Sequence, residues 1–277
     1  MYLYLVVYGG FNDILSRIIC LLNYCKKTER VLLLDTTKGC YKMNFSDYFS
    51  IDSNMIVYDI KKIRYICEKI EEKEIYPEFL SKKLIDLVDN KISLKFGMPT
   101  YTYNNKGFDL PKECKKNLLV YSCYGGGNGY RLFRLLKIRE DIVKYCEEVY
   151  NSIEKPYISI QVRHTDYKCD YERLYEDNRE YLEDKTIYLG TDNKKVVEYF
   201  ISKGLRIVNL TKYPEEESRN LHYSEVETYI KMRDLLCDIY MITRSEKIIS
   251  NSIGGFIRLL RESNNEYKKN EKIILEK

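Results

Sequence analysis

The sequence lacks several features that would place a protein in a known class at once. It has no tryptophan and only two histidines among 277 residues, and its nine cysteines form no C-x-x-C pair, so no zinc site is predicted. No apolar run approaches the roughly 20 residues that a helix needs to cross a bilayer, and no signal peptide precedes the first strand-like segment. A cytoplasmic location with free thiols is therefore expected, with peripheral contact to the inner face of a membrane left open.

Neither sign of charge dominates the chain. Its 46 Lys and Arg residues nearly balance 42 Asp and Glu residues, for a net charge of +4. Such a balance requires no polyanionic partner, so we do not expect a nucleic-acid partner, although a local basic patch could still bind one. A hydrophobic fraction of 44% supports a packed core, and the length fits one large domain or two of ordinary size.

The beginning of the chain has the pattern of a βαβ unit. Tyr2–Tyr8 is a continuous apolar run that ends in Gly9-Gly10, which is typical of a buried strand followed by a tight turn. Apolar residues at helical spacing follow from Ile14, and Val31–Leu34 has the composition of a second buried strand. A strand, a helix and a strand in so short a span predict a parallel sheet.

The second half of the chain repeats this alternation more regularly. Strands are predicted at residues 157–162, 185–189, 206–210 and 247–250, and helices at 194–203, 225–243 and 252–261. The tail from Ser263 is polar and charged. We therefore predict an α/β fold with two Rossmann-like domains facing a cleft, residues 1–150 and 151–277. Ligands of such folds bind beyond the carboxyl ends of the strands.

The first candidate site is Gly9-Gly10-Phe11-Asn12-Asp13, which follows the first predicted strand. Glycines allow close approach of a ligand to the backbone, and a helix N-terminus favours anions. The segment is not G-x-G-x-x-G, so no dinucleotide cofactor is indicated. A tight turn with a helix cap is the alternative interpretation.

The second candidate site is Arg163-His164-Thr165-Asp166, directly after the strand at 157–162. An arginine holds a diphosphate bidentately, and a glycosyl transfer that releases a nucleoside diphosphate needs a cation or fixed donors at the leaving oxygens. The chain has no D-x-D motif, so we expect no metal and a site built on Arg163. Asp166 is a natural partner for orienting Arg163 or His164. A surface ion pair is the alternative.

Two further candidates follow later strands. Thr191 and Asp192 follow the strand at 185–189, where a carboxylate can accept hydrogen bonds from a base or a ribose. Ser250, Asn251, Ser252 and Gly254 precede the last predicted helix, where hydroxyls and free N–H groups form a second phosphate cradle. Ordinary helix capping is the alternative for both segments.

These motifs, in this order, resemble the fucosyltransferase-like GT-B glycosyltransferases. That superfamily includes the bacterial nodulation fucosyltransferase, the core α1,6-fucosyltransferase and the protein O-fucosyltransferases. Their hallmarks are a strand ending in H-V-R-[RH], a later A-T-D-like turn and a final S-x-F-S-like helix start. Gln161-Val162-Arg163-His164, Leu189-Gly190-Thr191-Asp192 and Ser250-Asn251-Ser252 are similar in kind and order. The compact chain resembles bacterial or viral polysaccharide-synthesis members.

The resemblance implies an inverting, metal-independent transfer of a sugar, commonly L-fucose from GDP-fucose, to a glycan or lipid-linked oligosaccharide. It implies no cofactor beyond this nucleotide-sugar co-substrate. The N-terminal domain would face the acceptor and the C-terminal domain would bind the donor. Arg163 would then bind the β-phosphate, His164 would support the diphosphate or the sugar, and Asp192 would lie near the nucleoside.

By the same resemblance Thr191, Ser250, Asn251, Ser252 and Gly254 complete the donor site, together with Gly10 and Asn12 of the first loop. The chain departs from the pattern at Gln161, where His is usual, and at Ile253-Gly254-Gly255-Phe256, where serine and phenylalanine are usual. These departures leave the donor open. Another nucleotide sugar, such as a rhamnose or hexose donor, and a catalytically inactive GT-B-like glycan-binding protein are the alternatives.

An inverting transfer is helped by a base that takes the proton of the acceptor hydroxyl. Asp13 is a candidate because the first domain's loop would face the donor across the cleft. Asp166 and His222 are the alternatives among the titratable residues.

Overall fold

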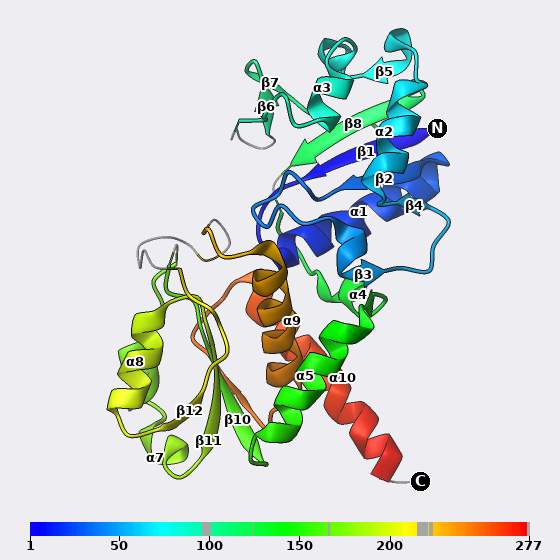
Figure 1. Ribbon diagram of the computed structural model, residues 1–277. Coiled ribbons are helices and arrows are strands. Elements are labelled where there is room, and N and C mark those ends of the chain that lie inside the picture. Colours follow the sequence, from blue (N-terminus) through cyan, green and yellow to red (C-terminus); the bar gives the residue numbers. More distant parts are fainter. Residues whose placement is uncertain (96–100, 124, 166, 215–220, 222–223, 276–277) are drawn as a thin grey trace. The chain divides into compact units, whose positions relative to one another are not determined.

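The computed structural model describes residues 1–95, 101–123, 125–165, 167–214, 221 and 224–275. The chain forms two compact units, residues 1–137 and 138–277 (Figure 1). Each unit contains one parallel sheet of four or five strands with helices packed against it. The predicted α/β class with two Rossmann-like domains is confirmed. No helix in the described part of the chain is both long and apolar enough to cross a membrane.

The boundary between the two units lies between Lys137 and Ile138, earlier than the predicted position at residue 150. The difference is helix α5 (Glu140–Ser152), which packs against α9 (Thr228–Arg244) of the second unit. Its buried side chains are those of Ile142 and Cys146. Sequence composition does not reveal which unit an amphipathic helix packs against, so the predicted boundary falls near the end of this helix and not before it.

The sheet of the first unit has the strand order β4-β2-β1-β8-β5, and all its strands are parallel. The central strands β1 (Tyr2–Val7), β2 (Val31–Asp35) and β8 (Leu118–Cys123) are apolar because both faces of the sheet are covered. Helix α1 (Phe11–Thr28) joins β1 to β2, as predicted. The edges are β4 (Ile56–Val57) and β5 (Ile75–Tyr76).

The remaining elements of the first unit are short, which explains why residues 40–115 have no clear sequence period. Helices α2 (Ile60–Glu68) and α3 (Leu84–Val88) pack on the sheet face that carries Tyr4 and Val6. The others are the 3₁₀ helices Phe45–Asp47, Glu72–Glu74 and Glu78–Leu80, the strands β3 (Phe49–Ser50), β6 (Thr102–Tyr103), β7 (Lys106–Gly107) and β9 (Lys137–Ile138), and helix α4 (Tyr130–Phe133).

The sheet of the second unit has the order β12-β11-β10-β13, again with parallel pairing. Strands β10 (Tyr157–Val162) and β11 (Thr186–Thr191) are buried along their whole length. Strand β12 (Arg206–Val208) is one edge, and β13 (Ile248–Ile249) is the other. The strand order reverses direction at β10, and such switch points are where open α/β sheets bind ligands.

Helices cover both faces of this second sheet (Figure 1). Helices α6 (Tyr171–Glu176), α7 (Arg179–Leu182) and α8 (Lys194–Ser202) pack on the face formed by Ile158, Ile160 and Leu189. Helix α9 covers the other face, where Tyr157 donates a 2.6 Å hydrogen bond to the carbonyl of Met241. Helices α6 and α7 are too short to produce a readable sequence period and were not predicted.

The last helix is longer than its predicted range of residues 252–261, because α10 runs from Gly255 to Leu275. This helix packs against α9. Its polar residue Asn264 is buried and donates two hydrogen bonds, at 2.8 and 2.9 Å, to the carbonyls of Thr243 and Ser245. These carbonyls lie at the C-terminus of α9, where the last turn leaves acceptors without an intrahelical partner. The polar side chain is therefore part of the interface between the two helices.

We expect Asn264→Ala to lower the free energy of unfolding by about 2 kcal/mol, because two carbonyls lose their donor. Denaturant unfolding of the purified variants measures this. The neighbour Asn265 is exposed, so Asn265→Ala is the matched control and should change stability by less than about 0.5 kcal/mol. Equal effects of the two substitutions would contradict the structural role of Asn264.

Candidate functional site

The candidate site of the second unit is the carboxyl edge of its sheet. The register of β10 on β11 ends with Val162 opposite Thr191, so the next residues, Arg163 and Asp192, leave the two strands side by side. Both had been predicted as site residues from their position after a strand. The parallel register brings them together because corresponding residues of adjacent parallel strands reach the same sheet edge.

Asp192 is bonded to the segment that follows Arg163. One carboxylate oxygen accepts the backbone N–H of His164 at 2.7 Å, and the other accepts the hydroxyl of Thr165 at 2.7 Å. The next residue, Asn193, donates from its side chain to the carbonyl of His164 at 3.3 Å. Asp192, which was predicted to lie near the nucleoside, is therefore hydrogen-bonded to the turn that carries Arg163, which was predicted to bind a phosphate.

The turn closes on itself through Cys169. The backbone N–H of Cys169 donates to the carbonyl of Arg163 at 3.1 Å. Its carbonyl lies 2.9 Å from Nδ1 of His164, and because a carbonyl only accepts, Nδ1 carries the proton in this contact. The other ring nitrogen, Nε2, is therefore available as an acceptor in neutral His164 or as a donor in the cation. The half-buried imidazole packs edge-on against Tyr171, with ring centroids 4.8 Å apart.

The predicted phosphate segment after β13 is bonded to both β10 and this turn. The hydroxyl of Ser250 donates to the side-chain carbonyl of Gln161 at 2.9 Å and accepts the N–H of Ser252 at 3.1 Å. The hydroxyl of Ser252 lies 3.1 Å from the thiol sulfur of Cys169, and both residues are buried. The side chain of Asn251 donates to the carbonyl of Asp170 at 2.7 Å.

Arg163 itself extends toward the start of α10. A Cβ placed on Gly254 would lie 3.8 Å from Nη1 of Arg163, so the guanidinium and the helix entrance share one region. The first N–H groups of a helix have no intrahelical acceptor, and they carry partial positive charge. A guanidinium beside such N–H groups is an arrangement that suits a phosphate or diphosphate.

The candidate residues of the first unit are bonded to a glycine-rich loop. Asp13 accepts the N–H of Gly126 at 2.9 Å and the N–H of Gly10 at 3.2 Å. The side chain of Asn12 accepts the N–H of Gly129 at 3.0 Å and donates to the carbonyl of Gly127 at 3.3 Å. The N-cap of α1 is Gly10, and the carboxylate of Asp13, in the first turn of the helix, accepts the N–H of this residue.

The sequence did not predict that this loop, residues 125–129, bonds the candidate residues Asn12 and Asp13. Its glycines are needed because a Cβ on Gly125 would lie 1.8 Å from Cβ of Asp13, and one on Gly129 would lie 2.8 Å from the carbonyl oxygen of Asn12. The density of glycines was the available signal, but nothing in the sequence indicates which helix they contact. The candidate bases Asp166 and His222 lie outside the described residues.

A half-buried carboxylate lies beneath the end of β11 and was also missed. Asp238 of α9 accepts a 2.7 Å hydrogen bond from Tyr188, and a Cβ on Gly190 would lie 3.8 Å from its carboxylate carbon. Burial raises the pKa of Asp238 to about 7, the Tyr188 hydrogen bond lowers it, and the nearby charge of Asp234 raises it. Asp238 is thus a titratable group close to the Gly190-Thr191-Asp192 turn.

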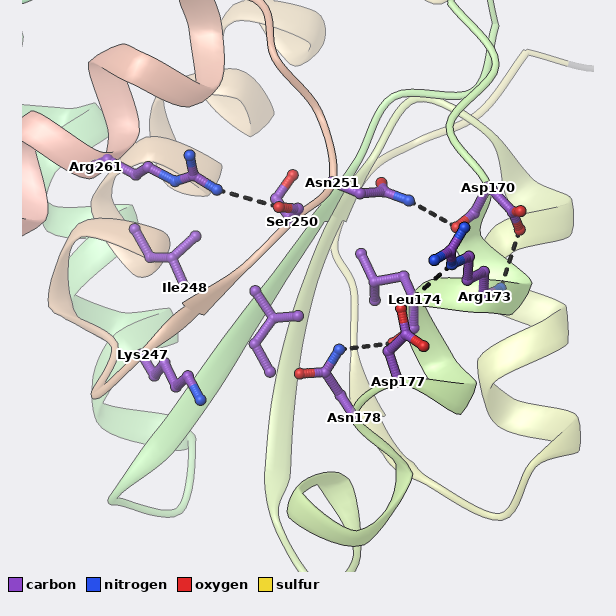
Figure 2. A pocket seen from close by; sticks show the side chains of 11 residues that line it. Asp170, Arg173, Leu174, Asp177, Asn178, Lys247, Ile248, Ser250, Asn251 and Arg261 are labelled. Atoms are coloured by element: carbon purple, nitrogen blue, oxygen red, sulfur yellow. Dashed lines mark hydrogen bonds and ion pairs between the residues drawn. The ribbon is translucent and has the colours of Figure 1, made fainter.

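A groove of about 540 Å³ runs along the edge strand β13, between α6 and α10 (Figure 2). Its lining consists of Asp170, Arg173, Leu174, Asp177, Asn178, Lys247, Ile248, Ile249, Ser250, Asn251 and Arg261. Arg173 pairs with Asp177 at 3.5 Å, and Arg261 donates to the carbonyl of Ser250 at 3.1 Å. The groove shares only Ser250 and Asn251 with the predicted donor residues, so it is not the region where Arg163 and Gly254 meet.

The two parallel sheets with helices packed against them define the class as an α/β protein with two Rossmann-like units. Within the described residues, no group of three or more His, Cys, Asp or Glu side chains is arranged to hold a metal ion. No protein-family model matches the sequence, and no curated protein matches it.

Solved structures, in contrast, match along almost the whole chain. A NodZ alpha-1,6-fucosyltransferase soaked with GDP-fucose has a TM-score of 0.63 at 17% identity, covering 94% of this chain and 91% of that chain. Fucosyltransferase NodZ from Bradyrhizobium gives 0.62 at 17%, covering 94% and 92%. POFUT1 in complex with GDP gives 0.55 at 11%, covering 95% of each chain. The predicted resemblance to the fucosyltransferase-like GT-B superfamily is confirmed as a likeness of fold.

The raised pKa of Asp238 predicts a specific pH dependence of stability. The folded protein keeps this proton up to about pH 7, whereas an unfolded chain releases it near 3.8. Between these values the folded state binds more protons, so the group's contribution to the free energy of unfolding falls as pH rises. The slope reaches about 1.4 kcal/mol per pH unit and vanishes above pH 7.

Denaturant unfolding between pH 4 and pH 8 checks this prediction. The free energy of unfolding of wild type minus that of Asp238→Asn should fall across this range, because the variant has no titrating carboxyl group at position 238. Tyr188→Phe removes a hydrogen bond that lowers the pKa of Asp238, and should extend the fall in stability to higher pH. Parallel pH profiles of wild type and Asp238→Asn would show that this carboxylate does not titrate in that range.

Proposed function

We propose that this chain is an inverting, metal-independent glycosyltransferase that moves L-fucose from GDP-fucose to a glycan or polysaccharide acceptor. The observation that carries the proposal is the meeting of Arg163 with the start of α10 at the carboxyl edge of a Rossmann-like sheet. A fold shared with fucosyltransferases whose structures were solved with GDP or GDP-fucose supports the choice of donor.

In this proposal Arg163 stabilises the leaving group. The acceptor hydroxyl attacks the anomeric carbon from the face opposite to the diphosphate, and the bond from that carbon to the phosphate oxygen breaks. The electron pair stays on the diphosphate, so negative charge grows on the β-phosphate oxygens. The Arg163 guanidinium and the N–H groups at the entrance of α10 are fixed donors for this charge, and fixed donors need no reorganisation during the reaction.

The side chains of Ser250, Asn251 and Ser252 contribute to this site mainly by shaping it. Each is bonded to another part of the unit, namely to Gln161, to the carbonyl of Asp170 and to Cys169. The backbone N–H groups that follow, toward Gly254 and Gly255, are then the donors that face a phosphate. The ring nitrogen Nε2 of His164 would bind the diphosphate or the sugar.

The proton of the acceptor hydroxyl must pass to a base or to water. Asp13 is the first candidate for this base, and its carboxylate accepts hydrogen bonds from the backbone N–H groups of Gly10 and Gly126. Asp166 and His222 are the alternatives. The first unit would bind the acceptor, a glycan or lipid-linked oligosaccharide, and the second unit would bind the donor.

We expect Arg163→Ala to weaken GDP binding at least tenfold and to reduce sugar transfer or donor hydrolysis by 100-fold or more, because a transition-state charge loses its cation. Isothermal titration with GDP and release of free fucose from GDP-fucose measure the two effects. Arg173→Ala is the matched control in the same unit, since Arg173 is exposed and pairs only with Asp177 in the described structure. Full activity of Arg163→Ala would exclude the proposed role.

Removal of divalent metal should leave donor binding intact. GDP at 100 times its Kd should stabilise the protein by about 2.7 kcal/mol, equally with and without a chelator. A thermal-shift panel with GDP, UDP, dTDP and their sugars measures this. Stabilisation by UDP or dTDP but not by GDP would indicate that the donor is another nucleotide sugar and not GDP-fucose. Binding of glycans without any donor hydrolysis or transfer would instead indicate an inactive glycan-binding protein.

A further inference from the structure

By the resemblance to fucosyltransferases, Asp192 would contact the nucleoside. Its two carboxylate oxygens are each engaged at 2.7 Å, one by the N–H of His164 and one by the hydroxyl of Thr165. Both donors belong to the turn that starts with Arg163. Two hydrogen bonds to one charged group fix both the distance and the orientation of that turn relative to β11.

These two hydrogen bonds of Asp192, called the clamp below, are anchored on the side of β11. Thr191 is the last residue of that strand, and its hydroxyl accepts the N–H of Asn193 at 3.3 Å. The side chain of Asn193 caps α8 by accepting the N–H of Lys195 at 2.9 Å, and also donates to the carbonyl of His164. Residues 191–193 therefore hold three groups of the turn while anchored to a strand and a helix.

The clamp determines where Arg163 can lie. Its backbone is held on one side by the last ladder pair, Val162 with Thr191, and on the other by the bond from His164 to Asp192. Its carbonyl accepts the N–H of Cys169. We propose that Asp192 is a positioning residue, which acts on donor binding through Arg163 and not by touching the donor. This inference rests on the proposed function.

The chemistry of asparagine distinguishes this role from a direct contact. In Asp192→Asn the amide oxygen can still accept the N–H of His164, and the amide nitrogen can donate to the hydroxyl of Thr165, which also accepts. The clamp then survives without its charge. A carboxylate that accepted hydrogen bonds from a ribose or a base would lose this function in both Asp192→Asn and Asp192→Ala.

The experiment is a double-mutant cycle on GDP affinity, measured by isothermal titration below the unfolding temperature of every variant. We expect Asp192→Asn to bind GDP within about threefold of wild type and Asp192→Ala to bind about tenfold more weakly. The double variant Arg163→Ala/Asp192→Ala should bind no more weakly than Arg163→Ala alone, because residues that act through one contact are not additive.

Three results would overturn the positioning role. They are equal losses for Asp192→Asn and Asp192→Ala, additive losses in the double variant, and wild-type affinity in a folded but destabilised Asp192→Ala. Should Asp192→Ala fail to fold, Thr165→Val removes one of the two bonds and should give a smaller loss that is also absent in the Arg163→Ala background. A wild-type protein that binds no GDP would refute the GDP donor and this inference together, whereas additive losses refute the inference alone.

Discussion

The hydrogen bonds of Asp192 join the carboxyl ends of β10 and β11, and the rest of the candidate site is built around this junction. They fix the turn that begins at Arg163, and Cys169 closes that turn. Cys169 in turn contacts Ser252, so the segment before α10 is held against the same turn. Three segments that are far apart in the sequence thus form one network, and each depends on the others for its orientation.

Much of the second unit is predictable from the sequence because its central strands, β10 and β11, are buried on both faces. Such strands are continuous apolar runs bounded by polar residues, and the limits of β10 were predicted without error for this reason. Parallel register then places Arg163 beside Asp192 with little further information. The order of strands, helices and strand-end polar residues was therefore sufficient to indicate the fold and the edge where a site would lie.

Other features depend on contacts that the sequence does not encode locally. The helical continuation of α10 past Ser263 depends on Asn264 bonding the end of α9, so a polar residue that suggests a tail is in fact buried. The placement of α5 depends on which unit offers its apolar face a partner. Likewise, Asn12 and Asp13 have the residue types of ligand-binding groups, but a loop more than 100 residues away takes up their hydrogen-bonding atoms.

The bond between Ser250 and Gln161 has a consequence for how this family of folds can vary. The position of Gln161 holds histidine in the fucosyltransferase pattern. Here the amide oxygen of Gln161 accepts a hydrogen bond from the hydroxyl of Ser250, and that hydroxyl in turn accepts one from the N–H of Ser252. An imidazole in place of the amide would have a different length and a different acceptor geometry, so the loop before α10 would have to be refitted at the same time. The amide of Gln161 thus ties the orientation of the segment before α10 to the end of β10, so a change at position 161 alone would alter the segment that precedes the helix.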